Sequence, residues 1–235
     1  MKVLIGTPIH EDKLYSWEEY VTHIKNIKIK MQGIVANVLI VDTTPDTEKS
    51  SASEVEFLAN KENFMFKSIS TKKKMDKVVA GRNLIFEVAK KGDYDAVLFI
   101  DSDVLVPSDV LDNLMQSRSN IVGGFYPITT ELGFPIPSAK MLNLNAGGYV
   151  PFPDENVDDK THSVDLIGMG CCLIKKDIFN QFEFRCERGA FSKLLKSEDM
   201  CFCEDLKKVG VDIKFNTAVV CKHKINGDHW DKELA

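Results

Sequence analysis

Two carboxylates, Asp101 and Asp103, directly follow five consecutive apolar residues at positions 96–100. Such a run is typical of a buried parallel strand, and open α/β sheets bind their ligands at the carboxyl ends of strands. Acids at positions i and i+2 suit a hard divalent cation, and such cations commonly bind together with phosphates. The pattern therefore predicts a metal-dependent enzyme that acts on a nucleotide-activated substrate.

A second Asp-x-Asp sequence, formed by Asp93 and Asp95, has the same spacing but precedes the predicted strand. It falls in a Gly-Asp turn after a predicted helix, where aspartate is a common turn residue. Position therefore distinguishes the two pairs, and we expect only the later pair to bind a ligand.

Two further strand ends carry polar residues. Thr7 and Pro8 follow a predicted strand at 2–5, and Asp42 follows one at 38–41. Because parallel strands end at the same edge of a sheet, these residues are expected near the Asp101 pair. Asp42 could bond a ribose hydroxyl or a base edge. The alternative is an ordinary aspartate turn after a strand.

Phosphate binding needs positive charge, because the chain has neither a G-x-G-x-x-G sequence nor a P-loop. Arg82 lies inside an apolar helix predicted at 75–90, where it either pairs with a carboxylate or phosphate or extends to water. His223 is a candidate third metal ligand beside the Asp pair, or else a structural residue. Lys222 and Lys224 flank it and could contact phosphate.

Glu198 and Asp199 follow Ser197 at the start of a predicted helix. One interpretation is local, since serine caps helices and acids near the first turn complement the helix dipole. The other is catalytic, since a carboxylate presented there could take a proton from an incoming hydroxyl. Both interpretations stay open at this point.

The bulk properties narrow the class of protein. The 235 residues with 44% hydrophobic content are enough for one sizeable core. A net charge of −5 argues against a broad nucleic-acid surface. No apolar stretch is long enough to span a bilayer, and no signal peptide is evident, so we expect a cytoplasmic protein. The six cysteines form no C-x-x-C pair and are expected to be reduced and structural.

The order of elements predicts an α/β fold with a mostly parallel, Rossmann-like sheet flanked by helices. Strands and helices alternate in the first part, with strands at 2–5, 38–41, 64–69 and 96–100 and helices at 14–31, 53–60, 75–90 and 107–117. A smaller, irregular, β-containing part follows, with a strand at 121–126, hairpins and loops at 127–153, a strand at 164–174, helices at 177–182 and 197–209, and a strand at 212–220.

Taken in order, these segments resemble a GT-A-type glycosyltransferase, closest in pattern to soluble inverting family-2-like members. The resemblance covers nearly the whole chain and is carried by the apolar-DSDV sequence ending at 101–104, by Gly-Met-Gly at 168–170 and by the acids at 198–199. It implies a single domain over 1–235. A nucleotide-binding half spans about 1–105, an acceptor half about 106–225 and a polar tail 226–235.

The resemblance also assigns roles on the donor side. It implies a UDP- or GDP-sugar lying across the strand ends with Mn²⁺ or Mg²⁺. Asp103 would bind the metal directly, Asp101 would contact ribose or the metal shell, and His223 would complete that shell. The remaining nucleotide-binding residues would be Thr7, Pro8, Asp42, Arg82, Ser102, Lys222 and Lys224.

On the acceptor side, the resemblance implies transfer to a glycan or another hydroxyl compound. Asp199, with Glu198 beside it, would be the base of an inverting reaction, and a retaining reaction stays open. Residues 168–170 would let the backbone approach the sugars. The segment 127–153 would shape the acceptor site. Candidate sugar-stacking rings, which could equally pack on the core, are Tyr126, Phe134, Tyr149 and Phe152.

Two other functions fit parts of the sequence. A haloacid-dehalogenase-like phosphatase would use Asp101 as nucleophile and Asp103 as acid and base. Its motif normally ends the first strand, whereas three strands are predicted before this one. A non-catalytic sugar- or nucleotide-binding module is the other alternative. The sugar, the base, the acceptor and the oligomeric state are left open.

Overall fold

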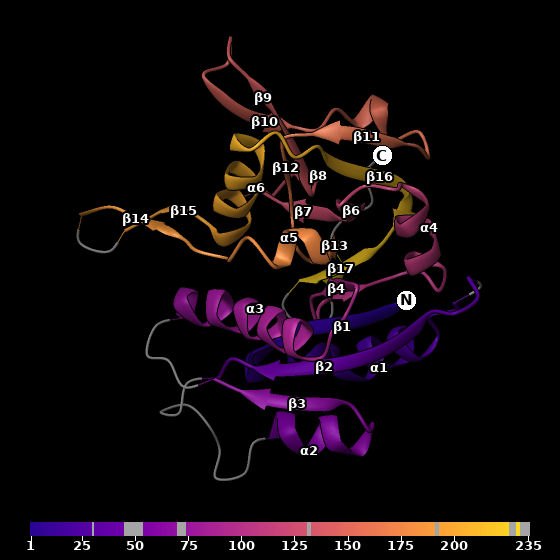
Figure 1. Ribbon diagram of the computed structural model, residues 1–235. Helices are drawn as coiled ribbons and strands as arrows, with labels where there is room; N and C mark the ends of the chain where they lie inside the picture. The colour runs from indigo at the N-terminus through magenta and orange to yellow at the C-terminus, as the bar shows by residue number, and fades with distance from the viewer. Residues whose placement is uncertain are drawn as a thin grey trace.

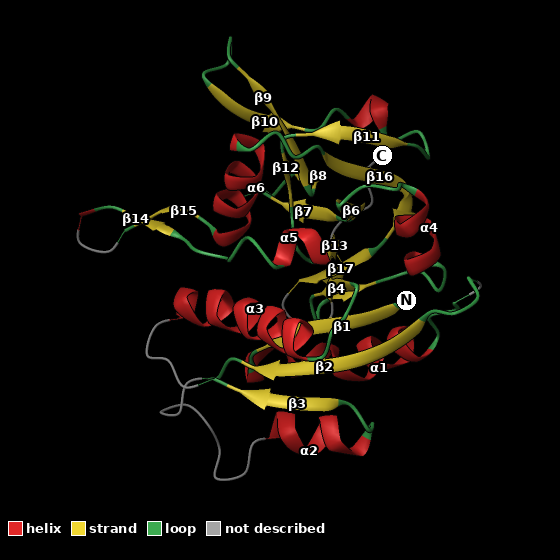
Figure 2. Cartoon of the chain, in the orientation of Figure 1, coloured by secondary structure: helices red, strands yellow, loops and turns green. Residues whose placement is uncertain are grey.

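The computed structural model describes residues 1–29, 31–44, 54–69, 74–130, 133–190, 193–225 and 229–230. Its centre is an eight-stranded sheet with the order β11-β16-β6-β13-β4-β1-β2-β3 (Figures 1 and 2). Of these, β13 and β11 run antiparallel to their neighbours. The strands are β1 (Lys2–Ile9), β2 (Val35–Asp42), β3 (Met65–Ser68), β4 (Ala96–Ile100), β6 (Ile121–Phe125), β11 (Thr161–Val164), β13 (Cys171–Lys175) and β16 (Ile213–Val220). The predicted α/β fold is confirmed.

Helices cover both faces of this sheet. Side chains of β4 alternate between two buried clusters, so that Leu98 packs on one face and Phe99 on the other. A strand buried on both faces must be apolar throughout, which explains the unbroken run before Asp101. The helices are η1 (Glu11–Ser16), α1 (Trp17–Lys25), α2 (Glu54–Lys61), α3 (Lys74–Lys91), α4 (Val110–Gln116), η2 (Asp154–Asn156), α5 (Lys176–Phe179) and α6 (Glu198–Lys208).

The first strand is longer than predicted. We expected Gly6 to break it, but β1 continues to Ile9 and pairs in parallel with β2 along its whole length. Gly6 is required by packing rather than by a turn, because a Cβ there would lie 2.4 Å from Cγ2 of Ile85 in α3. Pro8 is compatible with the strand, because a proline removes only one hydrogen-bond donor from the ladder, its own backbone N–H.

Two helix predictions also need correction. The predicted helix at 14–31 is a 3₁₀ turn, η1, followed by α1, which ends at Lys25. The helix predicted to begin at 107 begins at Val110. The predicted helix at 53–60 corresponds to α2, although Ser53 lies outside the described residues. No helix in the described part of the chain is long and apolar enough to cross a bilayer.

The second part of the chain builds small sheets against the large one. Residues 127–153 form hairpins as predicted: β7 (Pro127–Thr129) pairs with β8 (Pro135–Pro137), and β9 (Ala139–Asn143) pairs with β10 (Gly148–Pro151). A further hairpin joins β14 (Glu187–Arg188) to β15 (Leu194–Lys196).

The strand predicted at 164–174 is wrong as a single element. It is divided into the end of β11, then β12 (Leu166–Ile167), which pairs with β9, and then β13. The chain changes sheets at the loop that contains Gly168 and Gly170. A continuous apolar pattern therefore hid a change of pairing partner.

The segment after β16 is not simply a polar tail. β17 (Lys222–Ile225) pairs antiparallel with β5 (Val104–Leu105), and β18 (His229–Trp230) pairs with β17. The rest of the predicted tail, 226–228 and 231–235, lies outside the described residues. This pairing brings the end of the chain back to the residues that follow β4.

Candidate active site

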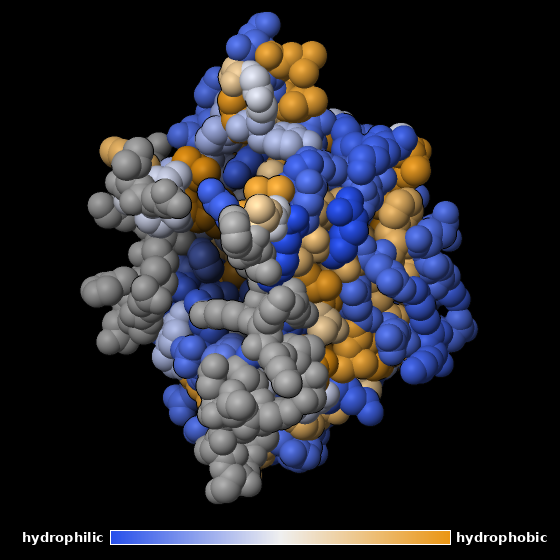
Figure 3. Space-filling view, turned by 90° about the vertical axis from the view of Figure 1, so that its left-hand side faces the viewer, coloured by the Kyte–Doolittle hydropathy of each residue, from blue (hydrophilic) through white to orange (hydrophobic). Residues whose placement is uncertain are grey.

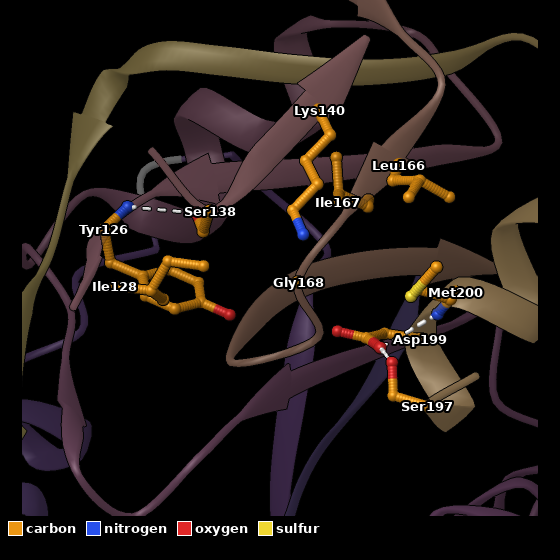
Figure 4. A pocket seen from close by; sticks show the side chains of 10 residues that line it. All are labelled: Tyr126, Ile128, Ser138, Lys140, Leu166, Ile167, Gly168, Ser197, Asp199 and Met200. Atoms are coloured by element: carbon orange, nitrogen blue, oxygen red, sulfur yellow. Dashed lines mark hydrogen bonds between the residues drawn. The ribbon is translucent and has the colours of Figure 1, made fainter. Parts of the chain in front are cut away.

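The face toward which β2 and β3 point carries two adjoining pockets. Figure 3 shows this face hollowed, with hydrophilic residues in the hollow. The strand-end pocket is lined by Pro8, His10, Lys13, Thr43, Val78, Arg82, Asp101, Ser102 and Asp103. The hairpin pocket is lined by Tyr126, Ile128, Ser138, Lys140, Leu166, Ile167, Gly168, Ser197, Asp199 and Met200 (Figure 4).

A tight turn after β4 presents the Asp pair. The amide of Val104 donates to the carbonyl of Asp101 at 2.9 Å, and the amide of Asp101 donates to the carbonyl of Gly170 at 3.0 Å. The turn is therefore fixed on both sides, by itself and by the glycine loop. Ser102 is almost fully buried within it and lines the strand-end pocket.

Asp103 and His223 lie together, as predicted. Nε2 of His223 is 3.8 Å from Oδ2 of Asp103, because β17 pairs His223 opposite Val104. Nδ1 of His223 lies 3.1 Å from the carbonyl oxygen of Pro127. A carbonyl can only accept, so Nδ1 carries a hydrogen, and Nε2 is the ring nitrogen nearest to Asp103. Metal-binding histidines commonly donate their other ring N–H to a backbone carbonyl in this way.

Lys13 already contacts the same carboxylate. Its ammonium donates to Oδ2 of Asp103 at 2.8 Å and to the hydroxyl of Tyr15 at 3.2 Å. Burial lowers the pKa of Lys13, but the contacts with Asp103 and Tyr15 together outweigh it and raise that pKa. The lysine therefore stays charged and places a positive charge in the strand-end pocket.

The predicted trio of metal ligands is not assembled. Oδ2 of Asp101 accepts from Nη2 of Arg82 at 3.2 Å, so this oxygen is paired with the arginine. Within the described residues, no group of three His, Cys, Asp or Glu side chains is arranged to hold a metal. Asp103 and His223 offer one oxygen and one nitrogen donor, which fits Mn²⁺ or Mg²⁺ only if a ligand supplies the other donors.

Arg82 lines the strand-end pocket and pairs with Glu198, the residue before Asp199. Its side chain is only 4% exposed, and its Nε lies 3.6 Å from Oε1 of Glu198. Burial disfavours the charged guanidinium, but Asp101 and Glu198 outweigh that effect and raise the pKa of Arg82. The predicted pairing of this interior arginine with carboxylates is confirmed. Burial also raises the pKa of Glu198, and Arg82 opposes that rise.

Asp199 is held by its neighbours at the start of α6. The hydroxyl of Ser197 donates to Oδ1 of Asp199, and the amide of Met200 donates to the same oxygen at 2.8 Å. Ser197 makes no side-chain hydrogen bond to the helix backbone, so it orients Asp199 and does not cap the helix in the usual way. The other carboxylate oxygen points toward Gly168 and the pocket interior (Figure 4).

The Gly-Met-Gly loop wraps around the phenol of Tyr126. The amide of Gly170 donates to Oη of Tyr126 at 3.1 Å. A Cβ at Gly168 would lie 2.1 Å from the same oxygen, so no larger residue fits there. The ring of Tyr126 also contacts the ring of His223 edge-on, with centroids 5.6 Å apart. Both glycines are thus needed for packing on Tyr126, and the role that the resemblance gives them, close approach of the backbone to the sugars, stays a prediction.

The other candidate sugar-stacking rings lie elsewhere. Phe152 is buried against Phe215 in the core. Tyr149 reaches Glu204 at 3.5 Å, and Phe134 is 65% exposed at the end of the β7–β8 hairpin. Of the four rings, only Tyr126 lines the hairpin pocket.

Two predicted nucleoside-binding residues are buried and do not line the strand-end pocket. Thr7 is fully buried, and its hydroxyl bonds to the hydroxyl of Tyr20 and, at 2.7 Å, to the carbonyl of Ile100. Asp42 is fully buried, and its Oδ1 accepts from the amide of Thr44 at 2.8 Å. This is the turn geometry that was the alternative for Asp42. Neither residue lines the strand-end pocket, in contrast to Pro8.

The two lysines beside His223 do not line either pocket. Nζ of Lys224 donates to Oε2 of Glu19 in α1 at 2.7 Å and forms an ion pair with that carboxylate. Lys222 is exposed. Strand alternation explains this, because the neighbours of a residue that faces a site point to the opposite side.

Sequence reasoning missed Lys13, His10 and Thr43. All three follow the ends of β1 or β2 and line the strand-end pocket. The available signal was position, since the loops after parallel strands share the ligand-binding edge. Lys13 was overlooked because it falls in an irregular segment before the first helix.

Comparisons with known proteins agree with this architecture. No family model matches the chain. A stretch of 76 residues, 31% of the chain, is 33% identical to glucose N-acetyltransferase 1 of Candida albicans and covers 16% of that protein.

Similar solved structures include GalNAc-T7 with UDP, GalNAc and Mn²⁺ (TM-score 0.64, 10% identity), which matches over 98% of this chain and 45% of that one. They also include the mannosyltransferase PcManGT of Pyrobaculum calidifontis with GDP-Man and Mn²⁺ (TM-score 0.59, 13% identity), which matches over 93% of this chain and 55% of that one. A197 from STIV (TM-score 0.55, 14% identity) matches over 100% of this chain and 95% of that one. The chain thus spans about half of the first two. The predicted GT-A fold is confirmed.

Proposed function

We propose that this protein is a glycosyltransferase that moves a sugar from a nucleoside diphosphate sugar to an acceptor hydroxyl. The observation that carries this proposal is the arrangement of the two pockets at the carboxyl edge of the sheet. Lys13, Asp103 and His223 gather where a diphosphate would bind, and Asp199 faces the adjoining pocket. The nucleotide, nucleotide sugar and Mn²⁺ held by solved structures of this fold support it.

On the donor side, the diphosphate would lie in the strand-end pocket. Asp103 and His223 would hold a divalent cation, whose remaining ligands come from the diphosphate. That cation would offset the charge that grows on the leaving phosphate. Lys13 would then exchange its contact with Asp103 for one with phosphate. Arg82 stays between Asp101 and Glu198, so it positions both carboxylates.

On the acceptor side, Asp199 would act as the general base. It would accept the proton of the acceptor hydroxyl as that oxygen bonds to the anomeric carbon. The bond from this carbon to the diphosphate breaks, and its electron pair leaves with the diphosphate, so the configuration inverts. Glu198 is buried against Arg82 and does not line the hairpin pocket, so we assign it a positioning role.

The geometry argues against the phosphatase alternative. Asp101 lines the strand-end pocket, but its carboxylate is paired with the buried Arg82, which weakens it as a nucleophile. The observed sheet is of the GT-A type. The non-catalytic alternative remains, and it predicts ligand binding without turnover.

The test is a thermal-shift panel of UDP, GDP, ADP and CDP, each with Mn²⁺, with Mg²⁺ and with a chelator. A ligand that binds only the folded state raises the melting temperature with its occupancy. We expect one nucleotide to raise it with metal, and we expect the shift to disappear with chelator and in Asp103→Ala. Asp93→Asn, in the other Asp-x-Asp sequence, is the matched control and should keep the shift.

Hydrolysis of the matching nucleotide sugar then separates catalysis from binding. Slow release of the free nucleotide by the wild type, lost in Asp103→Ala with the fold intact, would support the transferase. Binding without release, with or without candidate acceptors, would favour the binding module. No shift with any nucleotide would contradict the proposal.

A further inference from the structure

Lys140 places an uncompensated positive charge in the hairpin pocket. It lies on β9, and its ammonium extends into the pocket toward Gly168, on the same side as Asp199 (Figure 4). Among the described residues, no carboxylate forms an ion pair or hydrogen bond with this ammonium. The side chain is only partly exposed, so it is not an ordinary surface lysine.

Acids near Lys140 are paired with other lysines. The amide of Asp165 donates to the carbonyl of Lys140 at 3.1 Å, so the two backbones are adjacent. The carboxylate of Asp165, however, binds Lys207 at 2.8 Å. Glu204 on α6 binds Lys196 at 2.7 Å. Lys140 therefore has no acidic partner among the described residues because its side chain extends into the pocket.

The lining of the pocket favours a ligand group with a negative charge opposite Lys140. Asp199 is the only other charged residue that lines it among the described residues, and the lining includes the apolar side chains Ile128, Ile167 and Met200. A charge beside apolar walls is less screened than one in water, so an oppositely charged ligand group gains more there. A neutral ligand would have to bury or displace the ammonium without compensation.

We propose that the acceptor carries an acidic group, a carboxylate or a phosphate monoester, that pairs with Lys140 while the reacting hydroxyl faces Asp199. This inference rests on the proposed function and specifies its acceptor class. The charge belongs to the acceptor rather than the donor because Lys13, in the other pocket, already serves the diphosphate. Lys140 also offsets the repulsion between that acidic group and Asp199.

The test compares sugars matched in everything except charge at one carbon. The probes are the methyl glycosides of glucose, galactose and mannose, each also as its uronate and as its 6-phosphate. Binding is measured by titration calorimetry with wild type, Lys140→Met and Lys67→Met. Lys67 is an exposed strand lysine on β3 at the far edge of the large sheet, so its variant is the matched control.

We expect at least one acidic probe to bind wild type and Lys67→Met about tenfold more tightly than its neutral partner, as for one partly buried ion pair. The preference should fall to within about twofold in Lys140→Met, and it should weaken with salt. The uronate and phosphate arms distinguish the two sources of charge. If no acidic probe is preferred, or if the preference survives in Lys140→Met, the inference is overturned.

The nucleotide thermal shift keeps this result separate from the proposed function. Lys140→Met should keep the metal-dependent shift of the wild type. Loss of that shift would place Lys140 on the donor side and overturn the inference. A wild type without any nucleotide shift would contradict the transferase, while a Lys140-dependent acid preference would still establish an acidic-sugar pocket.

Discussion

The two pockets differ in how their charges are compensated. In the strand-end pocket Asp101 is paired with Arg82, and Asp103 with Lys13. In the hairpin pocket Lys140 makes no ion pair with a described residue, and Asp199 is oriented by neutral donors alone. A ligand must therefore exchange contacts in the first pocket, whereas it adds them in the second.

Arg82 links the turn that bears Asp101 and Asp103 to the start of the helix that bears Asp199. It binds a carboxylate from the turn after β4 and another from the start of α6. Removing one partner of a buried ion pair commonly costs about 3–5 kcal/mol, because the remaining charge is left uncompensated. Such a link keeps a base in one half at a fixed place relative to a diphosphate in the other. Positioning of this kind is a large part of catalysis.

The largest expected effect belongs to Asp199. Asp199→Asn keeps the shape and the hydrogen bonds to Oδ1 but cannot accept a proton. Transfer to an acceptor should fall about 10²- to 10⁴-fold, as for loss of a general base. The metal-dependent nucleotide shift should be unchanged, because the strand-end pocket is untouched.

Steady-state rates with the identified donor and acceptor measure this change. Glu204→Gln is a suitable control, since Glu204 is also on α6 but binds Lys196 and lies outside both pockets. An Asp199→Asn enzyme with near-normal transfer would show that another group takes the proton. It would then remove the functional contrast between the two pockets.

The next largest effect is expected for substitutions at the contact between Tyr126 and the glycine loop. Gly168→Ala places a Cβ about 2.1 Å from Oη of Tyr126, so it should destabilise the fold by about 1–3 kcal/mol as overpacking does. Tyr126→Phe removes that oxygen but leaves the buried amide of Gly170 unsatisfied, at a cost of about 1–3 kcal/mol.

Denaturant unfolding of both single variants and the double variant forms a cycle. The double variant should be less destabilised than the sum of the singles, because the clash needs the oxygen that Tyr126→Phe removes. Additive losses would mean that Gly168 is constrained by something other than Tyr126. Gly147→Ala, at a positive φ of 74° with open space around it, gives a backbone-strain reference without a clash.

The two regions also differ in how well the sequence predicted them. In residues 1–105, strands and helices alternate regularly, so the apolar run of β4 was located to the residue. In residues 106–225, hairpins such as β9–β10 are local, but other strands pair with distant segments. β17 pairs with β5, more than a hundred residues earlier, and no local pattern encodes that choice. The loop at Gly168 divides an apolar run between two sheets for the same reason.

The site divides in the same way. The pairings of Arg82 with a carboxylate and of Asp103 with His223 followed from residue type and strand ends. Thr7 lies inside β1, which runs further than predicted, and Asp42 is the last residue of β2; both are fully buried, and their nucleoside-binding roles stay predictions. Lys140 could not be anticipated, because its direction depends on how β9 pairs with β10 and β12.

A smaller effect concerns pH and Glu198. Burial raises the pKa of Glu198 above its ordinary value of 4.5, with Arg82 opposing. The folded state therefore holds this proton more tightly than the unfolded state. The resulting contribution to stability is full below about pH 4.5 and is lost as pH rises through the folded pKa. Glu198→Gln, which cannot ionise, should gain stability relative to wild type between pH 4 and pH 7.

Urea unfolding across that pH range measures the difference. Asp205 is a control of opposite sign, because Arg185 lowers the pKa of Asp205 to about 2. Its contribution is present above its ordinary value of 3.8 and is lost as pH falls toward 2, so Asp205→Asn should cost most at neutral pH. A stability gap for Glu198→Gln that moves in the same direction as that for Asp205→Asn would contradict the assignment.

The smallest effect, and the one that tests the exchange of contacts directly, belongs to Lys13. If Lys13 and a cation compete for Asp103, Lys13→Met should bind Mn²⁺ a few-fold more tightly in the absence of nucleotide. An exchange worth about 0.2–1 kcal/mol, as for partly exposed ion pairs, predicts this size. The same variant should bind the nucleotide less tightly, since it lacks a charge for the diphosphate. Titration calorimetry of metal and nucleotide separately shows whether the two affinities move in opposite directions. Weaker binding of both would mean that Lys13 supports the cation site and does not compete for it.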